Sequence, residues 1–325
     1  MRFSPSYTLD IIKEEDFNSE ILQVEQVIQE YKNFGEFDAF DKTKIYYEYY
    51  LVEKPKANVV IVHGLSEFIR KFDEFIYYLM NQGYNVFIYD QRCHGMSGRL
   101  TRSQHLLHVD NFKDYAADLE QFIEEIVLPT ENIPIYLYSH SMGGAVCTLY
   151  LAEHSDRVEK AVFSAPLFEP IVNSVPVPLA RVSVRLGRIF LGSKKRFFLS
   201  NDFDPEIKYK ESYGSSEARF YYNIKLRKEN EKYQSSPMSF GWVDNSLRIR
   251  RRLLKDRLIK GIKTPILLFS AENDRAVNNL PQREFADKCK TCRLIEVKGA
   301  THALLASESG ELEKLIKLTL DFYAN

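Results

Sequence analysis

Ser141 is the first residue of this sequence whose surroundings suggest chemistry. It lies in the stretch YSHSMGGAV, which follows a short apolar run and precedes a helical pattern. A strand-to-helix turn this abrupt exposes its central side chain and requires small neighbours, here Ser139, Gly143 and Gly144. The following helix N-terminus would offer free N–H groups to a developing oxyanion, with His140 and Gly143 in supporting positions. The alternative is a turn that merely contains a serine, because S-x-S-x-G is a short pattern.

A nucleophilic serine needs a base, which is usually a histidine held by a carboxylate. In enzymes that combine this turn with a parallel sheet, the chain order is Ser, acid, His. Only His154 and His302 follow Ser141. His154 lies within a helical pattern, whereas His302 lies in KGATHALL, just after a strand-like run. Order and context predict His302 as the base; the alternative is an ordinary surface histidine.

The acid should follow the strand before that histidine. The run PILLFSAENDRAV supplies two carboxylates just beyond a strand-like segment, Glu272 and Asp274. Asp274 stands four residues beyond the end of this segment and is followed by Arg-Ala-Val, so we predict it as the acid. Glu272 is the fallback, since either carboxylate could orient an imidazole.

An oxyanion hole needs two backbone N–H donors. Met142, directly after the serine, supplies one. The turn HGLSE follows another apolar run, and a glycine at Gly64 lets the backbone approach a substrate closely, which makes the N–H of Leu65 the second predicted donor. His63 and Glu67 are given supporting roles only. A further loop, YDQRCHGMSG, ends the next strand-like run and is predicted to brace the site rather than react in it.

Strand-like and helical patterns alternate along the chain, and this alternation must position these residues. Several runs are continuously apolar, which is typical of strands covered on both faces. Helical stripes lie between them, for example from Phe68 to Leu79 and from Phe112 to Ile126. We therefore predict an α/β fold with a mostly parallel sheet flanked by helices. The strand-like runs are 44–52, 58–64, 84–90, 133–139, 160–166, 264–270 and 292–299, and helices are expected near 281–289 and 309–323.

The alternation stops between about 171 and 245. An insertion of this length between two strands of one sheet is not expected to be a plain loop, so we interpret residues 171–245 as a helical cap or lid. The core then comprises residues 1–170 and 246–325. Within it, residues 1–35 are interpreted as an N-terminal helical extension.

The composition bears on the partners, the location and the metal content that we expect of the protein. Lys and Arg number 44 against 45 Asp and Glu, a net charge of -1, so nothing predicts a nucleic-acid partner. No apolar run is long enough to cross a bilayer and the N-terminus lacks the apolar segment of a secretion signal, so a cytoplasmic location is the expectation. Of four cysteines, Cys289 and Cys292 have zinc-site spacing but no second pair nearby. We expect ordinary thiols, no metal and no cofactor.

Taken together, these motifs resemble the α/β-hydrolase superfamily, in particular its monoacylglycerol lipase and lysophospholipase L2 branch. The resemblance rests on HG-x-x-E, D-x-R-x-H-G-x-S, H-S-M-G-G, the Asp274 turn and G-A-x-H, in the right order over most of 40–170 and 260–325. The segment SFGWVDNSL weakly favours the lysophospholipase L2 type. Two departures concern packing near the site: Ser139 replaces the usual first glycine of the serine turn, and Cys93 replaces a glycine of the D-x-R-G-H-G loop.

The resemblance implies a Ser141–Asp274–His302 triad. Ser141 would attack an ester carbonyl with His302 as general base, while the N–H groups of Leu65 and Met142 hold the oxyanion. His302 would then protonate the leaving alcohol, and water would release the acyl group.

The predicted cap carries a local charge signal. Residues 171–200 contain six Lys or Arg and no Asp or Glu. Within them, Arg181, Arg185 and Arg188 share a helical face beside an apolar stripe of Val182, Leu186 and Ile189, and the stretch 248–260 adds seven basic residues against one acid. Such a helix suits an anionic membrane surface or an acyl chain with an anionic head group; the alternative is an ordinary solvated face.

A hydrophobic pocket under such a cap predicts a lipid ester with one acyl chain, either a lysophospholipid or a monoacylglycerol, as substrate. Two other classes stay open. One is a short-chain esterase, thioesterase or peptidase of the same fold. The other is a ligand-binding protein without catalysis, which the complete set at 141, 274 and 302 disfavours.

Overall fold

A computed structural model describes residues 1–172, 177–209 and 215–325 of the chain. The remaining residues, 173–176 and 210–214, belong to the predicted cap, so that part of the cap prediction lies outside the described residues.

One sheet of eight strands forms the centre of the molecule, in the order β1-β2-β4-β3-β5-β6-β7-β8. The strands from β4 to β8 are parallel, while β2 pairs antiparallel with both β1 and β4. The predicted α/β class with a mostly parallel sheet is thus confirmed. The strands are β1 (Asn33–Asp38), β2 (Lys44–Tyr50), β3 (Asn58–Val62), β4 (Asn85–Tyr89), β5 (Ile135–His140), β6 (Lys160–Ser164), β7 (Ile266–Ala271) and β8 (Cys292–Val297).

Continuously apolar runs indeed form the strands that are covered on both faces. Every residue of β3, β4, β5 and β7 is buried. The edge strand β1 was not predicted, and its sequence NFGEFD explains why. Only Phe37 is buried in it, while Phe34 is 65% exposed. A polar edge strand of this kind lacks the apolar pattern that identifies an interior strand.

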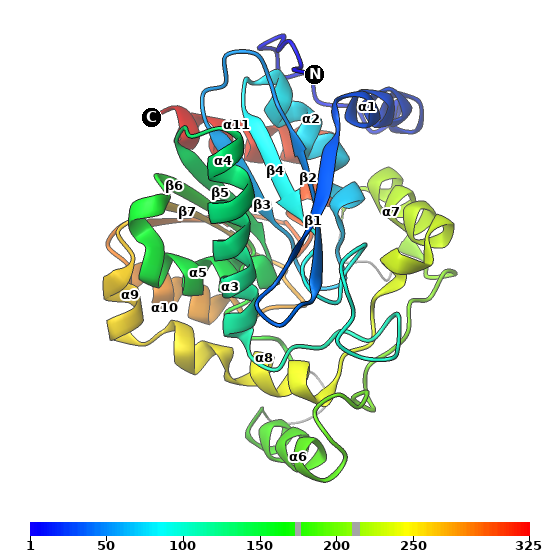
Figure 1. The fold of residues 1–325 in the computed structure, drawn as a ribbon, viewed down its shortest axis with the longest axis vertical. Helices are drawn as coiled ribbons and strands as arrows, with labels where there is room; N and C mark the ends of the chain where they lie inside the picture. The colour runs from blue at the N-terminus through cyan, green and yellow to red at the C-terminus, as the bar shows by residue number, and fades with distance from the viewer. Residues whose placement is uncertain (173–176, 210–214) are drawn as a thin grey trace.

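Helices cover both faces of the sheet (Figure 1). One apolar core lies under α3 (Phe112–Phe122), α5 (Met142–His154), α8 (Phe240–Leu253), α9 (Asp256–Gly261) and α10 (Asn279–Lys288). The opposite core lies under α1 (Phe17–Tyr31), α2 (Asp73–Asn81) and α11 (Ser309–Ala324). The described residues also form short helical turns: η1 (Ile69–Phe72), η2 (Ile123–Val127), α4 (Leu128–Thr130), η3 (Ser155–Arg157), η5 (Glu231–Gln234) and η6 (Leu304–Ala306). The helices expected at 281–289 and 309–323 are therefore confirmed.

The inserted segment between β6 and β7 contains α6 (Val177–Phe190), α7 (Glu217–Glu229) and the start of α8. In Figure 1, α6 and α7 lie away from the central sheet at separate places. The predicted boundary at residue 245 falls inside α8, whose Trp242, Ile249 and Leu253 belong to the main core. The division into a core and a cap stays a prediction. Within 1–35 the structure has α1, followed by the first residues of β1.

The basic face predicted on α6 is only partly exposed. Arg188 forms an ion pair with Asp244 of α8 (2.5 Å), and the Nε–H of Arg181 donates to the backbone oxygen of Leu247 (3.0 Å). Arg185 alone of the three predicted arginines is exposed. Arg181, Arg185 and Arg188 do lie on one face of α6, but the partners of Arg181 and Arg188 on α8, Leu247 and Asp244, come some 60 residues further along the chain.

Within the described ranges, no helix has the length and apolar content needed to cross a membrane.

Candidate active site

Ser141 occupies a strained turn between β5 and α5. Its backbone has φ 51° and ψ -116°, a conformation that costs about 1–3 kcal/mol and is maintained only by tight packing. The packing is visible at Gly143, where a Cβ atom would come within 2.0 Å of the Val62 oxygen of β3. At Gly144, a Cβ atom would come within 2.4 Å of Pro166. The small residues noted in the sequence are therefore required by the close approach of α5 to β3 and to the end of β6.

The substitution of glycine by Ser139 fits this turn. Its side chain is buried, and its hydroxyl donates to the backbone oxygen of Val162 on the neighbouring strand β6 (3.4 Å). The extra polar group thus has an acceptor inside the sheet.

The structure brings Ser141, His302 and Asp274 together from three separate strand ends. The Nδ1 of His302 lies 2.7 Å from Oδ2 of Asp274, and its Nε2 lies 2.9 Å from Oγ of Ser141. The Asp274 side chain is completely buried, and its Oδ1 accepts the N–H groups of Ala276 and Val277 (2.8 and 2.9 Å). Because a carboxylate only accepts, Nδ1 of His302 must donate, which leaves Nε2 free to accept the serine proton.

Burial favours the neutral form of His302. The loss of water lowers the pKa of His302 below its ordinary value, although the hydrogen bond to Asp274 acts in the opposite direction. A neutral imidazole is the form that can accept a proton.

The fallback acid Glu272 is not brought to His302. Its carboxylate instead accepts the N–H of Gly299 (2.9 Å) and pairs with Lys298 (3.0 Å) on the loop after β8. These two contacts, the first above all, lower the pKa of Glu272. Glu272 therefore fastens the loop that precedes His302 instead of contacting the imidazole.

Gly64 allows the turn after β3 to approach the serine. A Cβ atom at this position would lie 3.0 Å from the Cβ of Ser141 and 2.8 Å from Oε2 of Glu67. Among the residues that the structure describes, the N–H groups of Leu65 and Met142 have no hydrogen-bond acceptor. Two unpaired donors on either side of a serine are what an oxyanion hole requires.

His63 holds this turn in place. It accepts the N–H of Gln91 at Nε2 (2.9 Å) and donates from Nδ1 to the oxygen of Gly64 (2.8 Å). Complete burial lowers the pKa of His63 to about 4, so the ring is neutral with its proton on Nδ1. Its supporting position is thus structural: it connects the turn after β3 to the loop after β4.

Glu67 and His140 form a polar link beside the serine. Oε2 of Glu67 accepts from His140 Nδ1 (2.9 Å) and from the N–H of Gly64 (2.5 Å), and its other oxygen pairs with Lys71. The Nε2 of His140 faces the backbone oxygen of His302 (3.2 Å). Both ring nitrogens therefore face acceptors, and both bonds form together only when the ring carries two protons.

The loop YDQRCHGMSG braces the site, as predicted. Asp90 accepts the N–H groups of Ile69 and Met96 (2.9 and 2.7 Å), and Arg92 makes a buried bidentate pair with Asp118 of α3. Cys93 has φ 65°, the left-handed region that favours glycine. This explains why a glycine would be expected at this position, and the thiol here adds strain without adding a reactive group.

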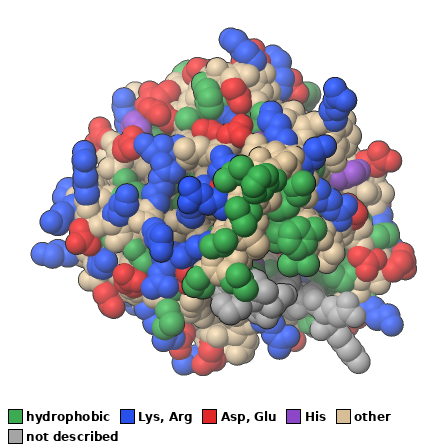
Figure 2. All heavy atoms as spheres, turned by 90° about the horizontal axis from the view of Figure 1, so that it is seen from below, with side chains coloured by type: hydrophobic (Ala, Val, Ile, Leu, Met, Phe, Trp, Pro, Cys, Tyr) green, Lys and Arg blue, Asp and Glu red, His purple; other side chains and the backbone are tan. Residues whose placement is uncertain are grey.

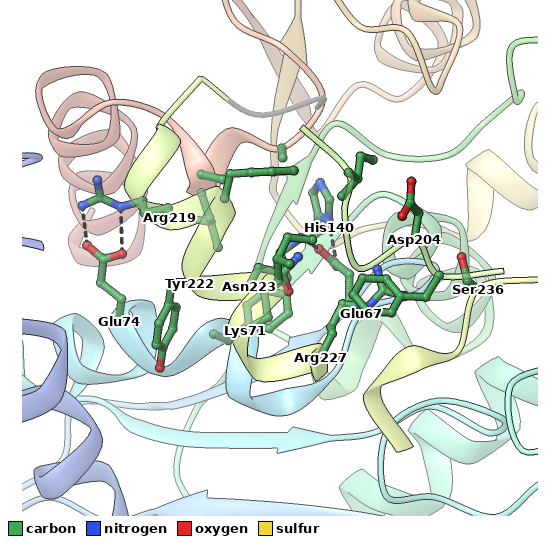
Figure 3. A pocket seen from close by; sticks show the side chains of 18 of the residues that line it. Glu67, Lys71, Glu74, His140, Asp204, Arg219, Tyr222, Asn223, Arg227 and Ser236 are labelled. Carbon is green, nitrogen blue, oxygen red and sulfur yellow. Dashed lines mark hydrogen bonds and ion pairs between the residues drawn. The ribbon is translucent and has the colours of Figure 1, made fainter. Parts of the chain in front are cut away.

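A cavity of about 530 Å³ is lined by His140, the residue before Ser141 (Figure 3). Ser141 and His302 do not line it themselves, but their chain neighbours His140 and Ala303 do. The opposite wall comes from α7. The lining combines polar and charged side chains with large apolar ones: Phe17, Phe72, Phe203, Ile207, Phe220, Ile224 and Leu305. The arrangement can bring an apolar acyl compound to a nucleophilic serine.

The sequence did not reveal two features of this site. One is the Glu67–His140–His302 link, which joins three strand ends through contacts with no local pattern. The other is the wall from α7, where Asn223 and Arg227 stand four residues apart on one helix face. That spacing is a sequence signal, but nothing in it indicates that the face borders a cavity.

Comparisons with known proteins agree with the fold and the motifs. The family model for serine aminopeptidase, S33, matches residues 53–309. Lysophospholipase L2 of Escherichia coli (strain K12) is 26% identical over 300 residues, which cover 89% of this chain and 86% of that protein. A probable lysophospholipase L2 of Haemophilus influenzae is 25% identical over 266 residues, 80% of this chain and 81% of the relative.

Two solved structures share the fold. A soluble variant of monoglyceride lipase from Saccharomyces cerevisiae, in complex with a substrate analog, superposes with a TM-score of 0.72 at 17% identity, covering 89% of this chain and 93% of that chain. The monoacylglycerol lipase of Paleococcus ferrophilus gives a TM-score of 0.63 at 24% identity, covering 85% and 98%. The predicted α/β-hydrolase resemblance is confirmed. With the family model spanning residues 53–309, the chain belongs to the serine aminopeptidase S33 family of α/β-hydrolases.

Proposed function

We propose that the protein is a serine carboxylester hydrolase that acts on lipids with a single acyl chain, lysophospholipids or monoacylglycerols. The observation that carries this proposal is the contact chain from Ser141 to His302 to Asp274, at 2.9 and 2.7 Å. The lipid part is supported by the large apolar side chains of the cavity beside it, whose volume lies in the range of small-molecule sites. It is also supported by relatives named lysophospholipase L2 and monoglyceride lipase.

In the proposed mechanism, Oγ of Ser141 attacks the ester carbonyl carbon while its proton passes to Nε2 of His302. The N–H groups of Leu65 and Met142 stabilise the negative oxygen of the tetrahedral intermediate. His302 then gives the proton to the leaving alcohol, and the acyl group remains on Ser141. A water molecule, deprotonated by His302, releases the fatty acid and restores the serine. Asp274 keeps the imidazole in the required tautomer throughout.

A panel of substrates tests this proposal. Monoacylglycerols, lysophospholipids, p-nitrophenyl esters of graded chain length and aminoacyl amides should separate the lipid hydrolase from a short-chain esterase, a thioesterase or a peptidase. We expect the highest kcat/KM for long single-chain esters. A preference for short esters or for amides would contradict the lipid assignment while leaving a serine hydrolase.

Variants of the contact chain test the catalytic assignment. Ser141→Ala should lower kcat by at least about 10³-fold, because the nucleophile is lost. Asp274→Asn should lower kcat by about 10³- to 10⁴-fold, since an amide can hold the wrong tautomer. Glu272→Gln is the matched control and should change kcat less than about threefold. Full activity of Ser141→Ala, or a loss confined to Glu272→Gln, would contradict the assignment.

We also propose that the outer face of α6 contacts an anionic membrane surface. Leu179, Val182, Leu186 and Ile189 are all exposed there, Ile189 by 64%. Figure 2, which views the molecule from the end where α6 lies, shows a hydrophobic patch bordered by Lys and Arg side chains. Contiguous exposed apolar surface with a basic border supports contact with anionic lipid. Arg185, exposed beside this stripe, supplies charge.

A further inference from the structure

Helix α7 presents several polar side chains to the cavity beside the serine. Asn223 and Arg227 are four residues apart and both line the cavity, as do Glu67 and His140 on the other side (Figure 3). The cavity therefore extends from the chain neighbours of Ser141 and His302 to this face of α7. The part of a substrate that enters it would lie along a wall that contains an arginine.

Arg227 is held rigidly. Its Nε donates to the backbone oxygen of Tyr233 (3.0 Å), its Nη2 donates to the backbone oxygen of Ser235 (3.3 Å), and its guanidinium lies 4.1 Å from the ring centroid of Phe203. A guanidinium has five N–H donors, so these contacts fix its plane and leave further donors unused. None of these partners carries a charge.

The other cations of the cavity wall are neutralised. Lys71 pairs with Glu67, and Arg219 pairs with Glu74 (2.6 Å) and Glu14 (3.0 Å). Arg227, in contrast, has no carboxylate within 4.0 Å in the parts of the chain that the structure describes.

The pKa of Arg227 is consistent with the lack of a described carboxylate beside it. Burial is the sole cause that shifts the pKa of Arg227, lowering it to about 10, so no described carboxylate compensates for the water that the cation has lost. The group still carries its charge at neutral pH. A half-buried, uncompensated cation that faces a cavity is stabilised by an anion bound there.

Acidic residues of the cavity do not provide that anion. Asp202 pairs with Arg196 (2.8 Å), and Asp204 is exposed and accepts the N–H of Glu206 (2.9 Å). The unused N–H groups of Arg227 thus remain for a ligand.

Asn223 adds a second, neutral contact. Its Oδ1 is buried and has no hydrogen-bond partner in the described structure. A buried acceptor of this kind costs free energy unless a donor reaches it. A hydroxyl group next to the anion would satisfy it, one helical turn away from Arg227.

We propose that Arg227 and Asn223 form an anion subsite that binds the phosphate of a glycerophospho head group, with Asn223 accepting from the adjacent glycerol hydroxyl. The proposal rests on the proposed ester hydrolase function and names the head group that this function prefers. A planar guanidinium matches two oxygens of a phosphate diester. A monoacylglycerol places no charge at this position and gains nothing from Arg227, so the subsite selects lysophospholipids.

The test compares two substrates with the same acyl chain, a lysophosphatidylglycerol and a monoacylglycerol, both below their critical micelle concentrations. The quantity measured is the ratio of their kcat/KM values. Arg227→Met should lower this ratio by about 10- to 100-fold, the size expected for a charge-assisted hydrogen bond. Asn223→Asp should lower it as well, because it adds a negative charge one turn away and leaves the bonds of Arg227 to Tyr233 and Ser235 intact.

Lys228→Met is the matched control. Lys228 is the next residue on α7, but it is exposed and pairs with Glu206 (3.1 Å) outside the cavity. It should change the ratio less than about twofold. An unchanged ratio in Arg227→Met, or in Asn223→Asp if the former does not fold, would overturn the subsite, as would an equal fall in Lys228→Met. A wild-type protein that hydrolyses neither substrate would instead contradict the proposed function.

Discussion

Helices α6 and α7 come from the same inserted segment but use their surfaces in opposite ways. The buried side of α7 combines Ile224 and Leu226 with Arg219, and the ion pairs of Arg219 fasten it to Glu74 of α2 and to Glu14, just before α1. The inner side of α6 packs on α8 through a small apolar cluster, and its outer side leaves large apolar residues in solvent. One helix is thus a fixed wall of the cavity beside Ser141, and the other leaves an apolar surface exposed to solvent.

Arg219 shows how α7 is fastened. Its side chain is 4% exposed and donates to Glu74, to Glu14 and to the backbone oxygen of Ile12. Tyr222 adds a hydrogen bond to Glu25 of α1 (2.8 Å). Because Glu14 and Glu25 both belong to the N-terminal segment, this segment holds the helix that borders the cavity. The predicted N-terminal extension therefore contributes indirectly to the site.

Of the changes proposed for the two helices, replacing Arg219, which fastens α7, should have the largest effect, on the stability of the protein. Arg219→Met leaves buried Glu74 without its partner, and we expect a loss of about 3–5 kcal/mol in the free energy of unfolding. Urea unfolding measures this loss. Arg185→Met on α6 is the control and should change the value by less than about 0.5 kcal/mol. Equal stabilities of the two variants would show that α7 is not fastened more firmly than α6.

Charging the exposed face of α6 should have the next largest effect, on membrane binding. Leu186→Glu combined with Ile189→Glu should lower partitioning to anionic vesicles by about 10- to 100-fold, because two apolar side chains can no longer enter the lipid interface. Co-sedimentation with vesicles measures it. Tyr221→Glu, at an exposed aromatic position of α7, is the control. If this control lowered partitioning equally, α6 would not be the docking face.

Replacing Arg185 or Arg188 of α6 should have smaller effects. The first replacement should act on vesicle binding and the second on stability. Arg185→Gln should weaken vesicle binding about fivefold at low salt, with the difference vanishing at high salt, because it removes one exposed charge near the lipid surface. Arg188→Gln should instead act on stability, since Arg188 pairs with Asp244. Vesicle binding at two salt concentrations and urea unfolding separate the two effects. A loss of stability alone in Arg185→Gln, or a loss of vesicle binding alone in Arg188→Gln, would contradict the orientation of α6.

The smallest effect concerns pH. His302 must be neutral to accept the serine proton, and burial holds its pKa below 6.5. Activity should therefore be lost only as the pH falls below the ordinary histidine range, and kcat/KM against pH should have its acid limb below 6.5. Variants on α6 should leave this limb unmoved because they do not contact the imidazole. An acid limb above 7 would mean that the charged form of His302 is stabilised.

The sequence locates the groups around Ser141 because each one follows a strand with a recognisable apolar run. It also predicts the α/β class, since interior strands and amphipathic helices carry local patterns. The edge strand β1 lacks such a pattern. The exposure of the α6 arginines has no local pattern either, because whether Arg188 meets solvent or Asp244 depends on how α8 packs.

The surroundings of Arg227 could not be predicted from the sequence either. Its position four residues after Asn223 is visible in the sequence, but whether a carboxylate of the described residues lies near it depends on the folded chain. Tertiary contacts therefore determine the features that distinguish α7 from α6, while local patterns determine the catalytic framework beneath them.

Identification of the covalent acyl-enzyme tests directly whether Ser141 is the nucleophile. The protein is mixed with a long-chain p-nitrophenyl ester, quenched in acid within its first turnovers, digested and analysed by mass spectrometry. We predict an acyl group on the peptide that contains Ser141, and no acyl group on the same peptide of Ser141→Ala. An acyl group on another residue, or continued hydrolysis by Ser141→Ala with no adduct, would contradict it.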